Sequence, residues 1–369
     1  MSFDWRDTAR TDIVRVWSVQ PSTLETIGEV TGIDLAASSL SAGYFTDTRT
    51  SGKLAIFGNG PAKNQWVRIT HEIPEWNFKE TLGTYLVKDE RFERDHGEWK
   101  RTLELQSTLY GLSTNLAHQP WALSEGASCL NAIRQLLKSC GSKYVESNPA
   151  DAAVTQTFVM ESGKSQLERL YDLCSRSGNR LDCNRNGYVS VSHYVNPAIK
   201  PACFTFDLAD PRGIVEDKLT MNDTSLTRPT ESVVRYKWTE GHESKKKGTH
   251  KTEKEAIGTA YAGGSQSADS RGFVVTDWTD VTDEHHEDLN ELAKRSLARL
   301  SPDRIEWTLN TTYLPIWEGD VVNLVLKDGP VGYSGTRKCV VKSIDIDLRY
   351  CAMNLTLKET GSPDEDGDG

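Results

Sequence analysis

The chain of 369 residues has no long apolar segment. No run approaches the roughly 20 consecutive apolar residues that a transmembrane helix needs. The first seven residues, Met-Ser-Phe-Asp-Trp-Arg-Asp, are also too polar for a secretory signal peptide. We therefore expect a soluble protein that is made in the cytoplasm and has no membrane segment.

Paired cysteines are absent as well. The sequence contains seven cysteines, an odd number, and no Cys-x-x-Cys pair. This pattern fits neither a disulfide framework nor a zinc site, so we expect buried, reduced thiols and neither a metal nor a cofactor. The seven thiols are Cys129, Cys140, Cys174, Cys183, Cys203, Cys339 and Cys351.

Positively charged residues are fewer than negatively charged ones. Lysine and arginine total 43 against 53 aspartates and glutamates, which gives a formal net charge of −10. A protein that reads DNA needs a clustered positive surface, because neutralising phosphates supplies most of its affinity. An acidic surface would instead let DNA pass without adhering. The length predicts two or more domains, since single cores stop growing at roughly 250–300 residues.

Catalytic motifs are also missing. His285 and His286 lie in Asp-Glu-His-His-Glu-Asp, which lacks the His-Glu-x-x-His spacing of a zinc-binding helix. There is no Gly-x-Ser-x-Gly elbow, and Gly58-Asn-Gly60-Pro has neither the lysine nor the helix of a phosphate loop. Ten tryptophans are spread evenly, as suits core and interface anchors better than a sugar site. We predict no catalytic residues and expect that the protein is not an enzyme.

Strand patterns fill the first 110 residues or so. Short β-prone runs contain Val14, Val16, Leu54, Ile56, Val67 and Ile69 and are broken by glycines. The clearest hairpin spans residues 81–109, where Gly83, Tyr85 and Val87 alternate before the turn and Leu103, Leu105 and Leu109 alternate after it. Such a sheet could close as a barrel.

Helix-forming sequence patterns begin near residue 120. Residues 128–141 form one amphipathic pattern that ends in Gly141, which suits a left-handed helix stop. Residues 165–178 repeat it, with a capping box from Ser165 to Glu168 and a stop at Gly178. Both units resume as a strand, so we predict a compact helix-strand module inserted between β regions. A chance match between two amphipathic helices is the alternative.

The segment after the second helix allows two interpretations. Asp182, Asn184, Asn186 and Gly187 match the opening of a calcium loop, which aims side-chain oxygens at one cation. However, His193 occupies the twelfth position, where a calcium loop needs a bidentate glutamate. Asn186-Gly187 also supplies the positive φ angles of a tight hairpin. We favour the hairpin and predict no metal site here.

The last third combines a loop, a helix and strands. A lysine-rich, then glycine-rich stretch at residues 239–270 predicts a mobile loop. Residues 289–300 carry one apolar stripe, typical of a helix laid across a sheet. Residues 344–348 and 353–357 alternate apolar and polar side chains, as half-buried antiparallel strands require. The acidic stretch 361–369 predicts disorder.

The order of these features resembles the baseplate or tail-tip hub proteins of tailed bacteriophages, and the related hub part of type VI secretion VgrG spikes. The resemblance spans nearly the whole chain. It rests on Trp66-Val-Arg-Ile with Glu80-Thr-Leu-Gly-Thr-Tyr-Leu-Val; on Ser165-Gln-Leu-Glu-Arg-Leu followed by Leu181-Asp-Cys-Asn-Arg-Asn-Gly-Tyr-Val-Ser-Val; on Glu231-Ser-Val-Val-Arg-Tyr leading to Leu289-Asn-Glu-Leu-Ala-Lys-Arg-Ser-Leu; and on Tyr313-Leu-Pro-Ile-Trp-Glu-Gly-Asp-Val-Val-Asn-Leu.

The resemblance implies a β-rich α+β fold with two tube-protein-like antiparallel β-barrel domains and an inserted small α/β module. The expected domains are a first barrel at 1–118, the module with its hairpin at 119–200, and a second barrel at 201–238 and 303–360. A mobile loop with an amphipathic helix would occupy 239–302, and a disordered acidic tail 361–369.

The implied function is that of a structural virion protein at the tip of a phage tail, assembled in the host cytoplasm. It would form a homotrimer that continues the tail tube and adapts six-fold to three-fold symmetry. Its partners would be the distal tail or tube protein ring, the tape measure protein and a central fibre or spike. Genomic DNA would pass through a net acidic lumen without sequence-specific binding.

Two alternatives stay open. One is a tail-associated protein that degrades the cell envelope or binds carbohydrate, which the tryptophans and the calcium-like loop would support. The chain ends soon after the hub-like core, without a long fibre, protease or lysozyme portion, so this role is not expected. The other is the hub of an injectisome spike, which shares the architecture and has different partners.

Overall fold

The computed structural model describes most of the chain, in two compact units. One unit comprises Met1–Thr220 with Trp307–Leu357, and the other comprises Met221–Glu306 with Lys358–Gly369. The described residues are 5, 10–58, 60–61, 64–95, 97–154, 157–160, 162–208, 210, 215–223, 228–244, 248–263, 267–281, 289–300, 305–327 and 334–360.

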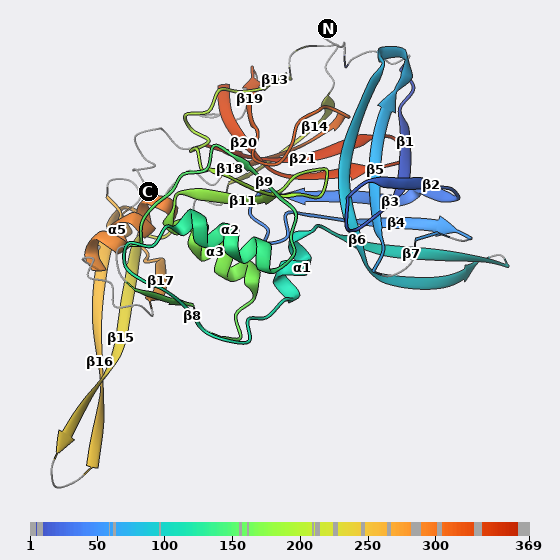
Figure 1. Cartoon of the computed structure of the whole chain (residues 1–369). Helices are drawn as coiled ribbons and strands as arrows, with labels where there is room; N and C mark the ends of the chain where they lie inside the picture. The colour runs from blue at the N-terminus through green and yellow to red at the C-terminus, as the bar shows by residue number, and fades with distance from the viewer. Residues whose placement is uncertain are drawn as a thin grey trace. The chain divides into compact units, whose positions relative to one another are not determined.

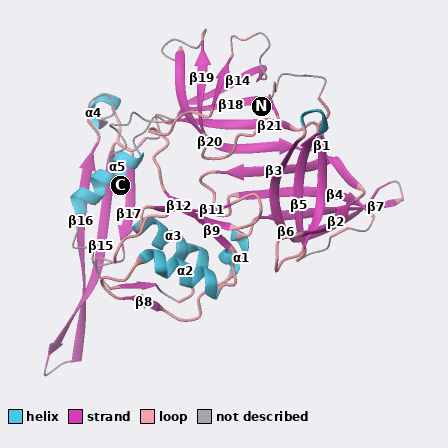
Figure 2. Ribbon diagram, turned by 45° about the horizontal axis from the view of Figure 1, so that its top comes forward, coloured by secondary structure: helices cyan, strands magenta, loops and turns pink. Residues whose placement is uncertain are grey.

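Strands dominate the structure, as Figure 2 shows. The large sheet contains β1 (Ile13–Val19), β2 (Thr26–Val30), β3 (Ile33–Gly43), β4 (Thr50–Phe57), β5 (Trp66–Ile73), β6 (Phe78–Asp95), β7 (Glu98–Gln106), β13 (Phe204–Asp207), β14 (Val215–Asp223), β18 (Ile305–Thr312), β19 (Val321–Leu326), β20 (Gly335–Asp347) and β21 (Ala352–Glu359). A short 3-10 helix, η1 (Pro74–Trp76), joins β5 to β6.

These thirteen strands form one sheet whose main path runs β14-β18-β21-β20-β3-β4-β7-β6-β5-β1-β2, with β19 and β13 branching from β20. The β-rich class is therefore confirmed. The two separate barrels are not, because no closed barrel forms among the strands of the described residues. The reason lies in β20, which pairs antiparallel with β3 from Ser343 opposite Gly43 to Asp347 opposite Ser39. This pairing joins the strands of both halves of the chain into one sheet.

The predicted hairpin near residues 81–109 is confirmed as β6 and β7, which pair antiparallel from Leu86 opposite Gln106 to Asp95 opposite Glu98. Leu103 and Leu105 are fully buried, as their alternation predicts. Leu109 differs from the prediction, since it begins helix α1 (Leu109–Thr114) instead of extending the strand. Its side chain packs in the core of the helical module.

The helical module forms as predicted from its caps. Helix α2 (Cys129–Ser139) begins after Ser128, and helix α3 (Gln166–Arg176) begins after Ser165 with a complete capping box. Gly141 and Gly178 take the left-handed conformation after the helices. Strands β8 (Trp121–Leu123), β9 (Tyr144–Ser147), β10 (Phe158–Met160), β11 (Asn179–Cys183) and β12 (Val189–His193) complete the module.

The two helices lie beside the small β9-β12-β11 sheet (Figures 1 and 2). Both units of the repeat contribute to one hydrophobic core, which includes Ile133, Leu137, Leu170 and Leu181. The parallel pairing of β9 with β12 joins the strand that follows the first helix to the hairpin that follows the second. The apolar sides of the two helices are thus buried within the module itself.

The second unit is built on a three-stranded sheet of β15 (Glu231–Ser244), β16 (Gly248–Tyr261) and β17 (Thr276–Val281). Helix α4 (Ala268–Arg271) precedes β17, and α5 (Leu289–Leu300) confirms the predicted amphipathic helix. The segment expected to be a mobile loop differs. Its residues pair as a ribbon up to Ser244 opposite Gly248, and β15 and β16 extend well beyond α5 (Figure 1).

The predictions for the cysteines and for membrane helices can be compared with the described residues. Four of the seven cysteines are buried and all are free, but Cys203 is exposed and Cys140 and Cys183 are only partly buried. None of the helices in the described part of the chain is both long and apolar enough to cross a bilayer. His285, His286 and the acidic stretch 361–369 lie outside the described residues.

Gly258 provides a test of the second unit, because the backbone of α5 lies directly against it. A Cβ at this position would collide with the backbone and the Cβ of Leu289. We expect Gly258→Ala to lower the free energy of unfolding of this unit by about 1–3 kcal/mol, since α5 must shift. Urea unfolding followed by circular dichroism measures the effect. Gly263→Ala is the matched control, because its Cβ meets open space; equal stability of the two variants would contradict the packing.

Candidate functional site

The calcium-like segment folds as a hairpin. β11 and β12 pair antiparallel from Asn179 opposite His193 to Cys183 opposite Val189, so this prediction is confirmed. Gly187 has a positive φ of 88°, whereas Asn186 does not share this conformation. The amide oxygen of Asn184 accepts a hydrogen bond from the Tyr188 backbone N–H at 2.9 Å. That oxygen is therefore committed to the turn.

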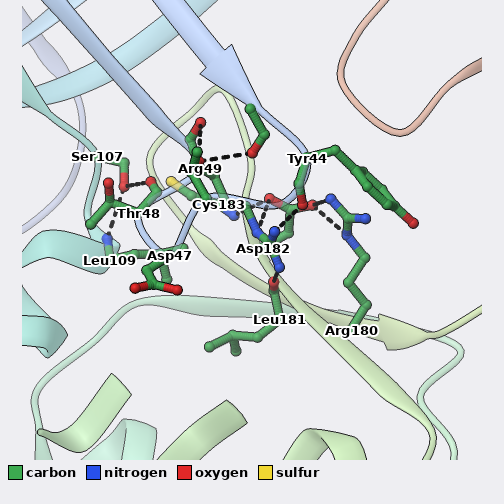
Figure 3. Close-up of polar contacts among 12 residues, drawn as sticks. Tyr44, Asp47, Thr48, Arg49, Ser107, Leu109, Arg180, Leu181, Asp182 and Cys183 are labelled. Atoms are coloured by element: carbon green, nitrogen blue, oxygen red, sulfur yellow. Dashed lines mark hydrogen bonds and ion pairs between the residues drawn. The ribbon is translucent and has the colours of Figure 1, made fainter. Parts of the chain in front are cut away.

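Asp182 faces arginines. Its Oδ2 accepts a hydrogen bond from Nε of Arg180 at 2.9 Å, and its Oδ1 lies 3.8 Å from Nε of Arg49 (Figure 3). The guanidinium groups supply the positive charge that a calcium ion would otherwise provide. The geometry thus favours the plain hairpin that the sequence pattern favoured.

Arg49 and Arg180 attach the module to the large sheet. Arg49 donates to the backbone carbonyl of Tyr44 and, at 3.2 Å, to that of Leu181. The Arg180 guanidinium lies 3.6 Å from the centre of the Tyr44 ring, in cation–π geometry. Gly319, with a φ of 85°, leaves room for this ring, because a Cβ there would collide with it.

Arg185, at the tip of the same hairpin, makes a second attachment. Its guanidinium lies 3.3 Å from the ring centre of Trp317 and forms an ion pair with Glu80. Glu80 also accepts a hydrogen bond from the Tyr313 hydroxyl at 2.6 Å. Burial lowers the pKa of Arg185 to about 10, so the side chain remains charged at neutral pH. We call the set Arg49, Arg180, Asp182, Arg185 and Trp317 the arginine junction.

Glu318 lies beside the arginine junction, in a cavity of about 400 Å³. Its Oε2 is buried and has no hydrogen-bond partner among the described residues. Burial, reinforced by repulsion from the Asp182 carboxylate, raises the pKa of Glu318 to about 7. Arg180 and Arg185 act in the opposite direction but do not cancel the desolvation. Polar side chains line this cavity, among them Thr84, Asn184 and Ser190.

One face of the large sheet is polar and runs across several strands. The register places Asp345 opposite Ser41 and Asp347 opposite Ser39, then Ser39 opposite Lys53, and Lys53 opposite Glu104. Because directly paired residues share a face, these six side chains lie on one side of the sheet. We call Ser39, Ser41, Lys53, Glu104, Asp345 and Asp347 the polar face.

The opposite side of the same strands is apolar. Leu40, Leu105, Ile344 and Ile346 occupy the alternating positions and are all nearly fully buried. The sheet therefore has one face packed in the core and one face open to water. The polar face carries three carboxylates and one lysine and is net acidic.

The polar face continues into an open groove of about 610 Å³. Here Nδ2 of Asn310 donates to Glu216 at 2.9 Å, and Nδ2 of Asn354 donates to Oδ1 of Asn310 at 2.5 Å. Short side chains, among them Ala36 and Ser39, also line the groove. The row of polar groups thus extends from β7 to β14.

The sequence showed part of this arrangement. The alternation in residues 344–348 correctly separated Asp345 and Asp347 from the buried isoleucines. The arginine junction was missed, because Arg180 and Arg185 meet aromatic rings far away in the sequence and Arg49 donates to the distant carbonyl of Leu181. No motif signals such a contact.

The fold is one found in phage tail proteins. The tail protein from Neisseria meningitidis MC58 matches 96% of this chain and 99% of its own length, with a TM-score of 0.67 at 13% identity. The prophage MuSo2 43 kDa tail protein from Shewanella oneidensis matches 95% and 97%, with a TM-score of 0.66 at 11% identity. A chain of the Francisella PdpA–VgrG complex aligns over 96% of this chain and 53% of its own length, with a TM-score of 0.54 at 9% identity.

These likenesses concern the fold. No protein-family model matches the sequence, and no curated protein matches it. The resemblance to phage tail and VgrG-related proteins, drawn from the order of sequence features, is thereby confirmed at the level of the fold.

The raised pKa of Glu318 predicts a pH-dependent stability. The folded protein holds this proton up to about pH 7, whereas the unfolded chain releases it near the ordinary glutamate pKa of 4.5. Stability from this group is complete below about pH 4.5 and is lost as the pH rises through 7. We expect Glu318→Gln to raise the free energy of unfolding by about 1–2 kcal/mol at pH 8.5 and to change it little at pH 5.

Urea unfolding of both proteins at the two pH values measures this difference. Glu125→Gln, at an exposed position of the module, serves as the control. The expected result is that the wild type gains about 1–2 kcal/mol more stability than the Glu318→Gln variant between pH 8.5 and pH 5. An equal effect of the two substitutions at both pH values would show that Glu318 is not desolvated.

Proposed function

We propose that this chain is a structural component of a phage tail and forms the homotrimeric hub at its distal end. Three copies, each contributing two tube-like portions of its sheet, would make a ring of six that continues the tail tube. The ring would change six-fold to three-fold symmetry at the tip. We further propose that the protein has no catalytic activity of its own.

The observation that carries this proposal is the polar face together with the two ends of the sheet. The main path of strands in the described residues begins at β14 and ends at β2, and is not closed within the chain. Free strand edges expose unpaired backbone groups, and ring closure with neighbouring copies would satisfy them. Ile27 lies on the edge strand β2 and is 67% exposed.

The polar face is the part that we assign to the lumen. Its side chains on β3 are serines, which leave space beside the sheet, and its carboxylates outnumber its one lysine. Carboxylates repel DNA phosphates and so would prevent a passing genome from being retained. The partners in this proposal are a tube or distal tail protein ring, a tape measure protein and a central fibre or spike, all within the virion.

The oligomeric state is the first test. We expect the purified protein to have about three times the 41.2 kDa mass of one chain when measured by light scattering after size exclusion. Ile27→Lys should lower the mass towards that of a monomer, because a charge on an edge strand opposes pairing. Val159→Lys, at another half-exposed apolar position, should keep the trimer. A wild-type monomer at high concentration would overturn the proposal.

Charge reversal on the polar face is the second test. We expect the assembled variant Asp345→Lys with Glu104→Lys to retain duplex DNA at low salt at least about tenfold more strongly than the wild type, because phosphate contacts dominate affinity. The control Asp269→Lys with Glu125→Lys makes the same change in net charge at exposed positions outside the large sheet. Gel retardation compares the two. Equal DNA retention by both variants would remove the polar face from the lumen.

A further inference from the structure

A cluster of three side chains of metal-ligating types lies in the large unit, one ring contact from the arginine junction through Tyr313. Asp12 precedes β1, His71 lies on β5, and Cys351 lies in the turn between β20 and β21. One ligand atom from each residue lies within 4.8 Å of the other two. Three distant segments of the chain therefore converge on one point.

The histidine in this cluster is incompletely satisfied. His71 is fully buried, and its Nε2 lies 2.7 Å from Oδ1 of Asp12. Its second ring nitrogen, Nδ1, is buried without a hydrogen-bond partner among the described residues. Because Nδ1 has no hydrogen-bond partner among the described residues, the ring proton can move from Nε2 to Nδ1 when Nε2 binds an ion.

The surroundings of the cluster resemble the outer shell of a metal site. Nε of Arg10 donates to Oδ2 of Asp12 at 3.0 Å, which leaves Oδ1 directed at His71. Such outer contacts orient carboxylate ligands. The rings of Tyr313 and Phe78 lie 4.3 and 5.8 Å from the imidazole, between ring centres. The aromatic shell shields the cluster from water on this side.

We propose that Asp12, His71 and Cys351 bind one divalent ion of the zinc class. The donor set of a carboxylate oxygen, an imidazole nitrogen and a thiolate suits zinc and cobalt, whereas calcium and magnesium prefer oxygen alone. One carboxylate and one thiolate balance the charge of the ion. Three protein ligands leave one coordination position for water.

Binding requires a small rearrangement. A zinc ion lies about 2.0–2.3 Å from each ligand atom, which separates tetrahedral ligands by roughly 3.3–3.8 Å. The Asp12–His71 separation of 2.7 Å is shorter, so the ion replaces the proton that these two residues share. That proton moves to Nδ1 of His71, and the Cys351 thiol proton passes to solvent. Burial raises the pKa of Cys351 to about 12, so metal affinity falls as the pH is lowered.

The consequence is a cross-link within the fold. An ion held by these residues ties the start of β1 to β5 and to the turn between β20 and β21, which lie in the two halves of the large sheet. An ion that binds only the folded chain stabilises it by mass action. The proposal concerns the single subunit and does not depend on the proposed hub function.

Cobalt titration of the full chain tests the site. We expect one Co²⁺ per chain, a thiolate-to-cobalt charge-transfer band in the absorption spectrum, and loss of that band when Zn²⁺ is added. Cys351→Ser should abolish the band. Cys203→Ser should retain it, and this control matters because Cys203 is the exposed thiol. Absence of the band in the folded wild type, or its persistence in Cys351→Ser, would overturn the proposal.

A second variant keeps the test decisive if Cys351→Ser does not fold. Asp12→Asn preserves the size of the side chain at a position that is only partly buried. We expect it to weaken Co²⁺ binding at least about tenfold and to remove the rise in melting temperature that Zn²⁺ gives the wild type. An Asp12→Asn protein that is folded by circular dichroism and binds Co²⁺ as tightly as the wild type would also reject the site.

Discussion

The pairing of β3 with β20 is the constraint on which the rest of this structure depends. It brings together residues that are about three hundred positions apart, as the hydrogen bond from Ser41 to Asp345 across 304 positions shows. Closing so long a loop costs chain entropy, although the cost grows only by about 0.6 kcal/mol for each doubling of length. Burial of Leu40, Ile344 and Ile346 along the same ladder offsets it. Without this ladder the strands would form two sheets, each with one more exposed edge.

The inserted module imposes a second requirement, because it must be held against the sheet that it interrupts. Arginines do this through two kinds of contact. Arg49 donates to backbone carbonyls on both sides, while Arg180 and Arg185 stack on Tyr44 and Trp317. A planar guanidinium offers stacking and several donors at once, which lysine cannot do. Removing one partner would leave a partly buried charge, so the attachment is specific as well as stable.

Local features of this fold could be predicted from the sequence, and long-range ones could not. The capping box at Ser165 and Glu168 and the glycine stops marked α2 and α3 to within a residue or two, because capping depends on neighbours in the chain. Asp345 and Asp347 were assigned to the open side of a strand from alternation alone. The alternation of polar and apolar residues shows that a segment is a strand. It does not show which other strand that segment pairs with, so the order of strands in the sheet could not be predicted.

The same limit explains the errors. Residues 239–261 carry lysines and glycines that favour a loop, yet the described residues of β15 and β16 pair antiparallel, because strand preference depends on context as well as on residue type. The candidate metal ligands show the limit most clearly. Their types are common in the sequence, and only the tertiary fold brings Asp12, His71 and Cys351 within 4.8 Å. No spacing rule applies to ligands taken from three separate segments.

An open sheet with one polar face creates a physical problem that assembly would solve. A long sheet with free edges invites uncontrolled pairing, and proteins oppose this by closing the sheet, covering its edges or charging them. In this chain the edge strand β2 carries the exposed apolar Ile27 and one charged residue, Glu29, which forms an ion pair with Arg15 of the neighbouring strand β1. The polar face, in contrast, carries three carboxylates and one lysine and is free of large apolar side chains. In the proposed ring, the edge with its apolar side chain would meet the next subunit, and the polar face would meet the water of the passage.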